Sequence, residues 1–139
     1  MTQMVLDASV TLAWVFKDEF SEYATRIAAI LHLDVAFVPA IWPMEVTNSI
    51  LSATRRGRLA PYRAYDFLNE IGKLRIEIDR EQHWQMVAQS ALDGGLRYGV
   101  SAYDASYLDL ALRRGLPLAT QDRRLAEAAL AAGIPMLEL

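Results

Sequence analysis

Short apolar runs alternate along the chain with longer segments in which apolar residues recur at helical spacing. The runs 4–6, 35–38 and 116–120 predict buried strands. The alternating stretch 76–79 predicts a half-exposed strand, and 134–137 predicts a short last one. The intervening segments predict helices over about 9–16, 19–32, 43–57, 61–72, 82–92, 101–114 and 122–132.

Strands that alternate with helices are typical of an α/β protein, in which a mostly parallel sheet is covered on both faces. With 139 residues, 53% of them hydrophobic, and no long linker, the chain is expected to form one domain over 1–139. Several residues suggest helix ends. Ser9 is expected to cap the first helix, Pro43 to lie in a first turn, Gly94–Gly95 to stop a helix and Gly115 to follow one.

Four acidic residues, Asp7, Glu45, Asp104 and Asp122, each stand where an apolar segment gives way to a predicted helix. In an open parallel sheet, ligands bind in the crevice beyond the carboxyl ends of the strands. Two carboxylates there would repel by about 4 kcal/mol at ~4 Å and an effective dielectric constant of ~20. A divalent cation would remove that repulsion, so the pattern predicts a metal site. Oxygen ligands favour Mg²⁺, or Mn²⁺, over zinc.

Taken one at a time, the acidic residues also have structural explanations. Asp7 would accept backbone bonds in a turn, Glu45 would suit a helix dipole, and Asp122 would cap the last helix. Ser101 and Asp104 match a capping box with Asp in place of Glu. Caps alone need no common meeting point, however, and the sheet would bring all four residues to one edge. The joint pattern therefore favours a site.

Neutral polar residues accompany the four acids. Ser9 and Thr120 lie close to Asp7 and Asp122 in the sequence, and Asn48 follows Glu45 by three residues, on the same helical face. Their hydroxyl and amide groups would orient the metal ligands. Their alternative role is as helix caps or surface polar residues.

Composition excludes several other kinds of chemistry. The chain has no cysteine, and its two histidines, His32 and His83, are isolated, so thiolate chemistry and zinc motifs are not expected. No apolar run approaches the roughly 18 residues that span a bilayer, and no signal peptide is recognisable, so a cytoplasmic protein is expected. The net charge of −3 argues against a broadly basic nucleic-acid surface but allows a local one.

Four stretches, VLDASVTLAWVF, VPAIWPMEVTNSIL, YGVSAYDASYLDLA and LPLATQDRRLAEAA, together resemble the PIN-domain family, and within it the VapC-type toxins of toxin–antitoxin pairs. The resemblance implies a PIN-like three-layer α/β/α fold. It also implies that Asp7, Glu45, Asp104 and Asp122 bind metal and are catalytic, with Ser9, Asn48 and Thr120 beside them. Mg²⁺-dependent cleavage of RNA, a homodimer and an antitoxin partner are implied as well. Ala13 departs from relatives that carry a basic residue before the Trp.

Two further sets of residues are expected to contact partners. RNA phosphates are expected to meet arginines, namely Arg55, Arg56, Arg58, Arg63, Arg123 and Arg124, although a solvated surface is an alternative. A groove for the antitoxin is expected where apolar residues cluster near the acids, namely Leu12, Trp14, Val15, Phe16, Ile41 and Trp42. A further aromatic group, Tyr62, Tyr65, Phe67 and Leu68, would serve the dimer or complete the core.

Three alternatives remain at this stage. A receiver-like signalling domain also binds Mg²⁺ at strand ends, but the chain lacks an acidic pair at Asp7–Ala8 and a Lys near Thr120. A haloacid-type phosphatase would need an Asp where Ser9 stands. The third alternative is a catalytically inactive PIN module that only binds its partner.

Overall fold

The computed structural model describes residues 2–80 and 83–139. Four strands lie in these ranges: β1 (Met4–Leu6), β2 (Ala36–Val38), β3 (Ile76–Ile78) and β4 (Leu118–Ala119). The α-helices are α1 (Ala8–Ala13), α2 (Glu22–Ile30), α3 (Trp42–Arg55), α4 (Pro61–Ile71), α5 (Trp84–Tyr98), α6 (Ala102–Arg114) and α7 (Arg123–Ala131). A 3₁₀ turn, η1 (Lys17–Glu19), follows α1.

The four strands form one parallel sheet in the order β3-β2-β1-β4. In the centre, Val5 of β1 lies opposite Phe37 of β2 on one side and Leu118 of β4 on the other. The predicted parallel sheet is confirmed. The predicted strand 134–137 is reduced to one bridge, between Leu118 and Met136.

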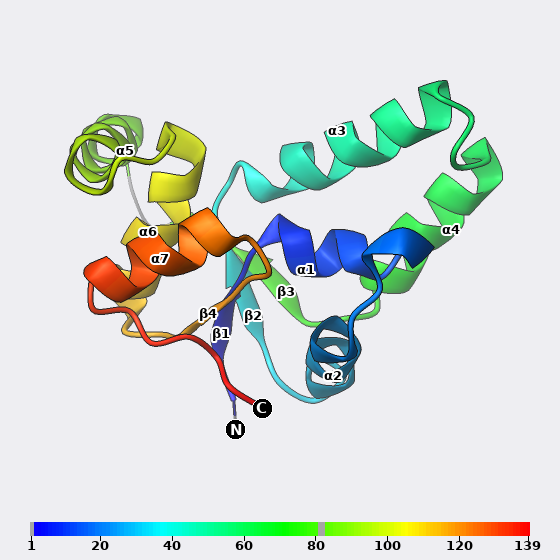
Figure 1. Cartoon of the computed structure of the whole chain (residues 1–139), viewed down its shortest axis with the longest axis horizontal. Coiled ribbons are helices and arrows are strands. Elements are labelled where there is room, and N and C mark those ends of the chain that lie inside the picture. The colour runs from blue at the N-terminus through cyan, green and yellow to red at the C-terminus, as the bar shows by residue number, and fades with distance from the viewer. Residues whose placement is uncertain (1, 81–82) are drawn as a thin grey trace.

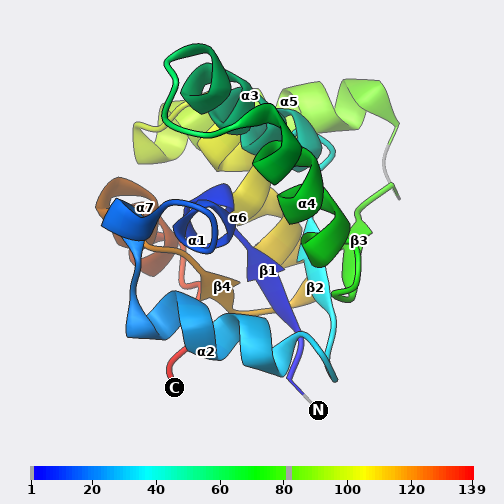
Figure 2. The ribbon, with the colours of Figure 1, turned by 90° about the vertical axis from the view of Figure 1, so that its right-hand side faces the viewer.

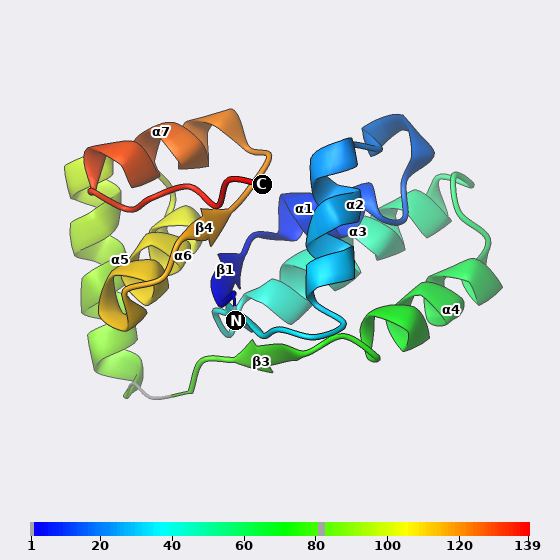
Figure 3. The same ribbon diagram turned by 90° about the horizontal axis from the view of Figure 1, so that it is seen from below.

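Helices cover both faces of the sheet. Figures 1 and 3 show α1 to α4 on one side and α5 to α7 on the other, which confirms the three-layer α/β/α arrangement. Figure 2 shows β1 and β2 side by side, each running away from the end at which the N-terminus lies. All three residues of β1 are fully buried, as expected for a central strand covered on both faces.

The first helix differs from its prediction at both ends. It begins directly after Asp7, which occupies the N-cap position, so the expectation that Ser9 caps it is wrong. It ends at Ala13 rather than near Phe16, whose backbone is extended (φ −99°, ψ 116°). The break lets the Phe16 side chain turn inward, where it is buried. Trp14, Val15 and Phe16 therefore lie just past the helix.

The predicted stop at Gly94–Gly95 is also wrong, because α5 runs through both glycines to Tyr98 and ends at Gly99 with φ 65°. A Cβ atom at Gly94 would lie 3.1 Å from the Cβ of Ala105, which is tighter than an ordinary contact, so glycine favours the close approach of α6. The predicted start of this helix, Gln82, lies outside the described residues. Within the described chain, no helix has the length and apolarity needed to cross a membrane.

Candidate active site

The four acidic residues come from four separate segments that begin near the carboxyl edge of the sheet. Asp7 follows β1, and Asp122 follows β4 as the N-cap of α7. Glu45 lies in the first turn of α3, and Asp104 in the first turn of α6. The negative charges interact: Asp7 and Asp104 repel the charge on Glu45, and Asp122 and Asp7 repel the charge on Asp104. The fold thus assembles the four carboxylates in one region.

Asp7 is the most enclosed of the four, with only 6% of the residue exposed. Its Oδ2 atom accepts two hydroxyl hydrogen bonds, from Ser9 at 2.6 Å and from Thr120 at 2.7 Å. Each hydroxyl in turn accepts a backbone N–H, Ser9 from Gln121 at 2.9 Å and Thr120 from Asp122 at 3.0 Å. Because a backbone N–H only donates, these bonds leave both hydroxyls free to donate to Asp7.

Glu45 is held by a different residue. The hydroxyl of Tyr107, in α6, donates to Glu45 Oε1 at 2.6 Å. Tyr107 is fully buried, and burial raises the pKa of its hydroxyl. Sequence reasoning missed this residue, because a Tyr three positions after Asp104 in an apolar helix is indistinguishable from an ordinary core residue.

The other two acids have fewer constraints on their side chains. Asp122 caps α7 as expected: its Oδ1 accepts the N–H groups of Arg124 (2.9 Å) and Leu125 (3.2 Å). Ser101 caps α6 by accepting the Asp104 N–H at 3.0 Å, as half of the expected capping box. No protein group in the described chain hydrogen-bonds the Asp104 carboxylate, which remains open to a ligand.

Burial and mutual repulsion shift the titration of three of these groups. Burial raises the pKa of Asp7, against the opposing effect of the Ser9 and Thr120 hydrogen bonds. Burial also raises the pKa of Glu45, opposed by the Tyr107 hydrogen bond and assisted by Asp7 and Asp104. The pKa of Asp104 is raised by burial and then by Asp122 and Asp7, while Arg124 lowers it. A positive charge among them would relieve this strain.

The donor set suits a hard divalent cation, since it consists of carboxylate and hydroxyl oxygens. The carboxylates are not, however, drawn into a ready-made cage. Over residues 2–80 and 83–139, no three Asp, Glu or His side chains lie close enough together to hold one ion. Repulsion among like charges is a physical reason for that spacing. Chemistry and electrostatics therefore fit a cation, and binding one requires the carboxylates to draw inward.

The other predicted residues lie at varied distances from this region. Asn48 is exposed on α3, where it lines a hollow with Leu12 and Phe16, and it bonds to none of the carboxylates described. Arg55 is ten residues after Glu45, which places it about 15 Å away along the helix. Arg58 pairs with Asp18 at 3.2 Å and lies over the Phe16 ring at 5.0 Å.

The arginines at the start of α7 are closer to the carboxylates. Arg124 acts electrostatically on Asp104. Arg123 is highly exposed and contacts Glu127 at 3.3 Å.

The two remaining arginines lie elsewhere. Arg56 lines the same hollow as Asn48, and Arg63 lies in α4.

The residues predicted to bind an antitoxin divide into two groups. Trp42 is buried in the core, and so is Phe16. Leu12, Trp14, Val15 and Ile41 are partly exposed, and the Trp14 indole donates to the Ala24 carbonyl at 2.7 Å.

Helix α4 lies beside the second group. Val15 and Tyr62 line two adjoining hollows, one with Phe16 and Arg58 and the other with Trp14 and Phe67. Tyr62 and Tyr65 are exposed and do not complete the core, whereas Phe67 is partly buried and packs against it. Trp14 and Val15 of the first apolar set thus adjoin Tyr62 and Phe67 of the second.

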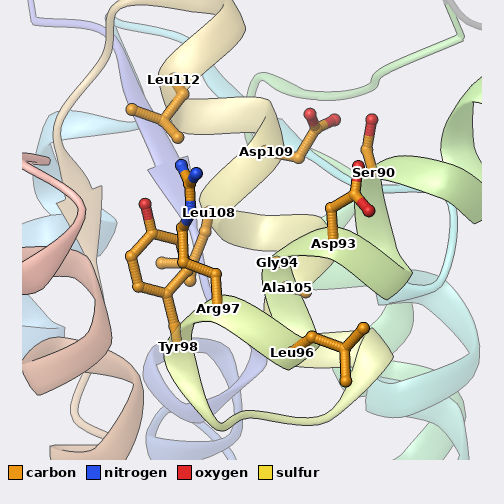
Figure 4. Close-up of a pocket in the computed structure, with 10 residues that line it drawn as sticks. All are labelled: Ser90, Asp93, Gly94, Leu96, Arg97, Tyr98, Ala105, Leu108, Asp109 and Leu112. Carbon is orange, nitrogen blue, oxygen red and sulfur yellow. The ribbon is translucent and has the colours of Figure 1, made fainter.

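Another hollow, of about 590 Å³, lies between α5 and α6 (Figure 4). Leu108, Asp109 and Leu112 of α6 face Ser90, Asp93 and Arg97 of α5 across it. It contains none of the four carboxylates. Sequence reasoning did not single out this region.

Comparison with known proteins identifies the family. The PIN domain family model matches residues 4–130. Ribonuclease VapC3 from Pyrobaculum aerophilum is 35% identical over 129 residues, which are 90% of this chain and 93% of that protein. The crystal structure of PAE2754 from Pyrobaculum aerophilum superposes with a TM-score of 0.67 at 22% identity, over 91% of this chain and 86% of that one, and supports the fold. The receiver-like and phosphatase alternatives receive no support. This chain belongs to the PIN-domain family, among its VapC-type members.

Proposed function

We propose that this protein is a metal-dependent endoribonuclease that acts as the toxin of a toxin–antitoxin pair. The observation that carries the proposal is the gathering of Asp7, Glu45, Asp104 and Asp122 from four segments into one electrostatically coupled group. The similarity to Ribonuclease VapC3 supports the choice of RNA as the substrate.

In this proposal the four carboxylates hold Mg²⁺, or Mn²⁺ in its place. The bound cation supplies Lewis-acid stabilisation of phosphate charge and lowers the pKa of a water molecule. The reaction requires no protein nucleophile. The chain has no cysteine, and the Ser9 and Thr120 hydroxyls are committed to Asp7. In the proposed reaction, water adds to phosphorus as the P–O3′ bond breaks, which leaves a 5′-phosphate and a 3′-hydroxyl.

Each residue has a distinct task in this reaction. Ser9 and Thr120 keep Asp7 oriented, and their backbone partners are Gln121 and Asp122 itself. Arg124, whose charge reaches Asp104, is placed to hold an RNA phosphate beside the carboxylates, and exposed Arg123 extends the same basic edge. Arg55, the last residue of α3, and Arg56 and Arg58 just beyond it would contact a more remote part of the RNA.

The antitoxin is proposed to bind the surface on which Trp14, Val15 and Tyr62 adjoin. Tyr62 is 68% exposed, so Tyr62→Ser can change this surface without disturbing the core. We expect this variant to cleave RNA normally while the co-expressed antitoxin protects cells less well. Full protection of cells that produce a folded Tyr62→Ser protein would place the antitoxin elsewhere. Phe16 belongs to the groove predicted from the sequence, but it is buried. A substitution there would disturb the core and is therefore a poorer test of the antitoxin surface.

We also propose that the protein works in the cytoplasm as a homodimer. None of the residues of α5 is buried, and Trp84, Leu92 and Leu96 are exposed, so this helix offers apolar surface to a second copy. Sedimentation at micromolar concentration should show a species larger than the 15.6 kDa monomer. Detection of the monomer alone would contradict the dimer.

The function is tested by brief induction of the parent protein in cells, followed by sequencing of RNA ends. We expect growth arrest and new 5′-phosphate ends at a few defined positions. The Asp7→Asn variant should produce neither effect, because it keeps the shape of the side chain and loses its charge. An inactive binding module would give the same RNA ends with both proteins, and that result would refute the proposed enzyme.

A further inference from the structure

The environment of Tyr107 points to a role that sequence reasoning did not assign. Tyr107 lies in α6, three residues after Asp104, and reaches across to Glu45 of α3, which is 62 residues away in the sequence. Its hydroxyl is fully buried, so it has no access to solvent water in place of a protein partner. The Ser9 and Thr120 hydroxyls both bond to Asp7, whereas the phenol bonds to the half-buried carboxylate of Glu45.

The direction of this hydrogen bond is set by its partners. An ionised carboxylate only accepts, so Tyr107 is the donor to Glu45 Oε1. Burial raises the pKa of the same phenol and outweighs the effect of the Ala8 backbone, next to Asp7, which lowers the pKa. The hydroxyl therefore ties α6 to the Glu45 side chain of α3. One oxygen of Glu45 is occupied in this way, and Oε2 has no described protein partner.

A fixed carboxylate has a consequence for cation binding. Glu45 is on a longer side chain than the three aspartates, and its carboxylate is only half-buried, so without a partner it would sample several rotamers. Because the four carboxylates must draw inward to share an ion, the ligand that is already oriented loses less entropy on binding. Groups that orient metal ligands typically change metal affinity by about 10–100-fold.

We propose that Tyr107 is a positioning residue that holds Glu45 with Oε2 turned to the cation and thereby strengthens metal binding. The inference rests on the proposed metal site. Tyr107 touches neither RNA nor metal, and it acts only through Glu45. Replacement by Phe removes the hydroxyl and leaves the buried ring in place.

The test measures Mn²⁺ affinity by electron paramagnetic resonance in the full chain. Tyr107→Phe should bind Mn²⁺ about 10–100-fold more weakly than the parent. Tyr103→Phe is the matched control, because Tyr103 lies in the same helix, is 59% exposed and should retain parental affinity. In a Glu45→Ala background, Tyr107→Phe should cause no further loss, since the side chain that it positions is gone. An equal loss of Mn²⁺ affinity in the Glu45→Ala background would overturn the proposal. Unchanged Mn²⁺ affinity when Tyr107→Phe is made in the parent protein would overturn it as well.

A second measurement needs no metal. In ¹³C NMR spectra of the metal-free protein, the Glu45 carboxyl resonance should move in Tyr107→Phe and stay in place in Tyr103→Phe. An unmoved resonance would refute the positioning role whether or not a cation binds. A parent protein that binds no Mn²⁺ would instead refute the proposed metal site and the effect on affinity, while the Glu45 resonance would still decide whether Tyr107 holds that carboxylate.

Discussion

Asp79, just beyond β3, joins the edge of the sheet to the C-terminal end of α6. Its carboxylate accepts from Arg113 at 2.6 Å and from Arg114 at 3.4 Å. Arg113 also bonds to Asp109 at 2.8 Å, and the Arg114 guanidinium lies 4.1 Å from the centre of the Phe37 ring. Since α6 carries Asp104 and Tyr107, this contact also fixes the helix that supplies part of the site. The substitution Asp79→Asn keeps the shape and removes the charge.

The expected loss follows from burial. The Asp79 side chain is only 8% exposed, whereas the two arginine side chains are about a quarter exposed. Hydrogen bonds to charged groups contribute about 1.5–3 kcal/mol, and partial exposure favours the lower part of this range. We therefore expect Asp79→Asn to lower the free energy of unfolding by about 2 kcal/mol. For 139 residues, with an unfolding entropy of about 2.1 cal/mol/K per residue, that corresponds to a melting temperature lower by about 7 °C.

The loss should depend on pH. Burial alone would raise the pKa of Asp79, but the hydrogen bonds and charges of Arg113 and Arg114 outweigh it and lower the pKa. A carboxyl group whose pKa is lower in the folded state stabilises the protein above its unfolded pKa of about 3.9. This contribution is lost as pH falls through the folded pKa. The difference in the free energy of unfolding between the parent and Asp79→Asn should therefore be largest at pH 7 and should decrease toward pH 3.

Urea unfolding followed by circular dichroism at several pH values measures both effects. Glu77→Gln, an exposed position in β3, is the control and should leave stability within about 0.5 kcal/mol of the parent. Equal stabilities of parent and Asp79→Asn at pH 7 would show that the arginine contacts add nothing. A difference that does not change with pH would show that its origin is not the Asp79 charge.

Two further predictions concern the packing of α5 and the binding of RNA. Gly94→Leu should lower the free energy of unfolding by about 1–3 kcal/mol despite the good helix propensity of Leu, because its Cβ would crowd Ala105. Chemical denaturation measures this loss, and unchanged stability would contradict the close packing. Arg124→Gln should raise the KM for RNA and should reduce, by about one, the slope of log affinity for RNA against log salt concentration. Arg26→Gln, at an exposed position of α2, should change neither quantity. Equal KM values for the two variants would exclude the proposed phosphate contact.

The parts of the fold that depend on local patterns could be predicted from the sequence. The buried runs gave the strands of the parallel sheet, and Ser101, Gly115 and Asp122 marked helix ends that the structure confirms. The end of α1 and the continuity of α5 could not be predicted in this way. Both depend on tertiary packing, namely the burial of Phe16 and the contact between Gly94 and Ala105.

The functional site also has residues that the local sequence predicts and residues that depend on tertiary contacts. The four acids could be found because each stands at the start of a helix after an apolar segment. The hydroxyls of Ser9 and Thr120 are near Asp7 as their sequence positions suggested, although Ser9 does not cap the helix. The contacts of Tyr107 with Glu45 and of Asp79 with Arg113 join residues 62 and 34 positions apart. Nothing in the local sequence around either residue indicates its partner.

The central claim, that the four carboxylates act together through a divalent cation to hydrolyse RNA, is tested most directly by one measurement. The initial rate of cleavage of a single-stranded RNA is recorded against Mg²⁺ concentration for the parent and for Asp104→Asn, purified identically. We expect no cleavage by the parent in EDTA, saturable recovery with Mg²⁺, and no cleavage by Asp104→Asn at any concentration. Cleavage by the parent in EDTA, or a parental rate in Asp104→Asn, would contradict the account.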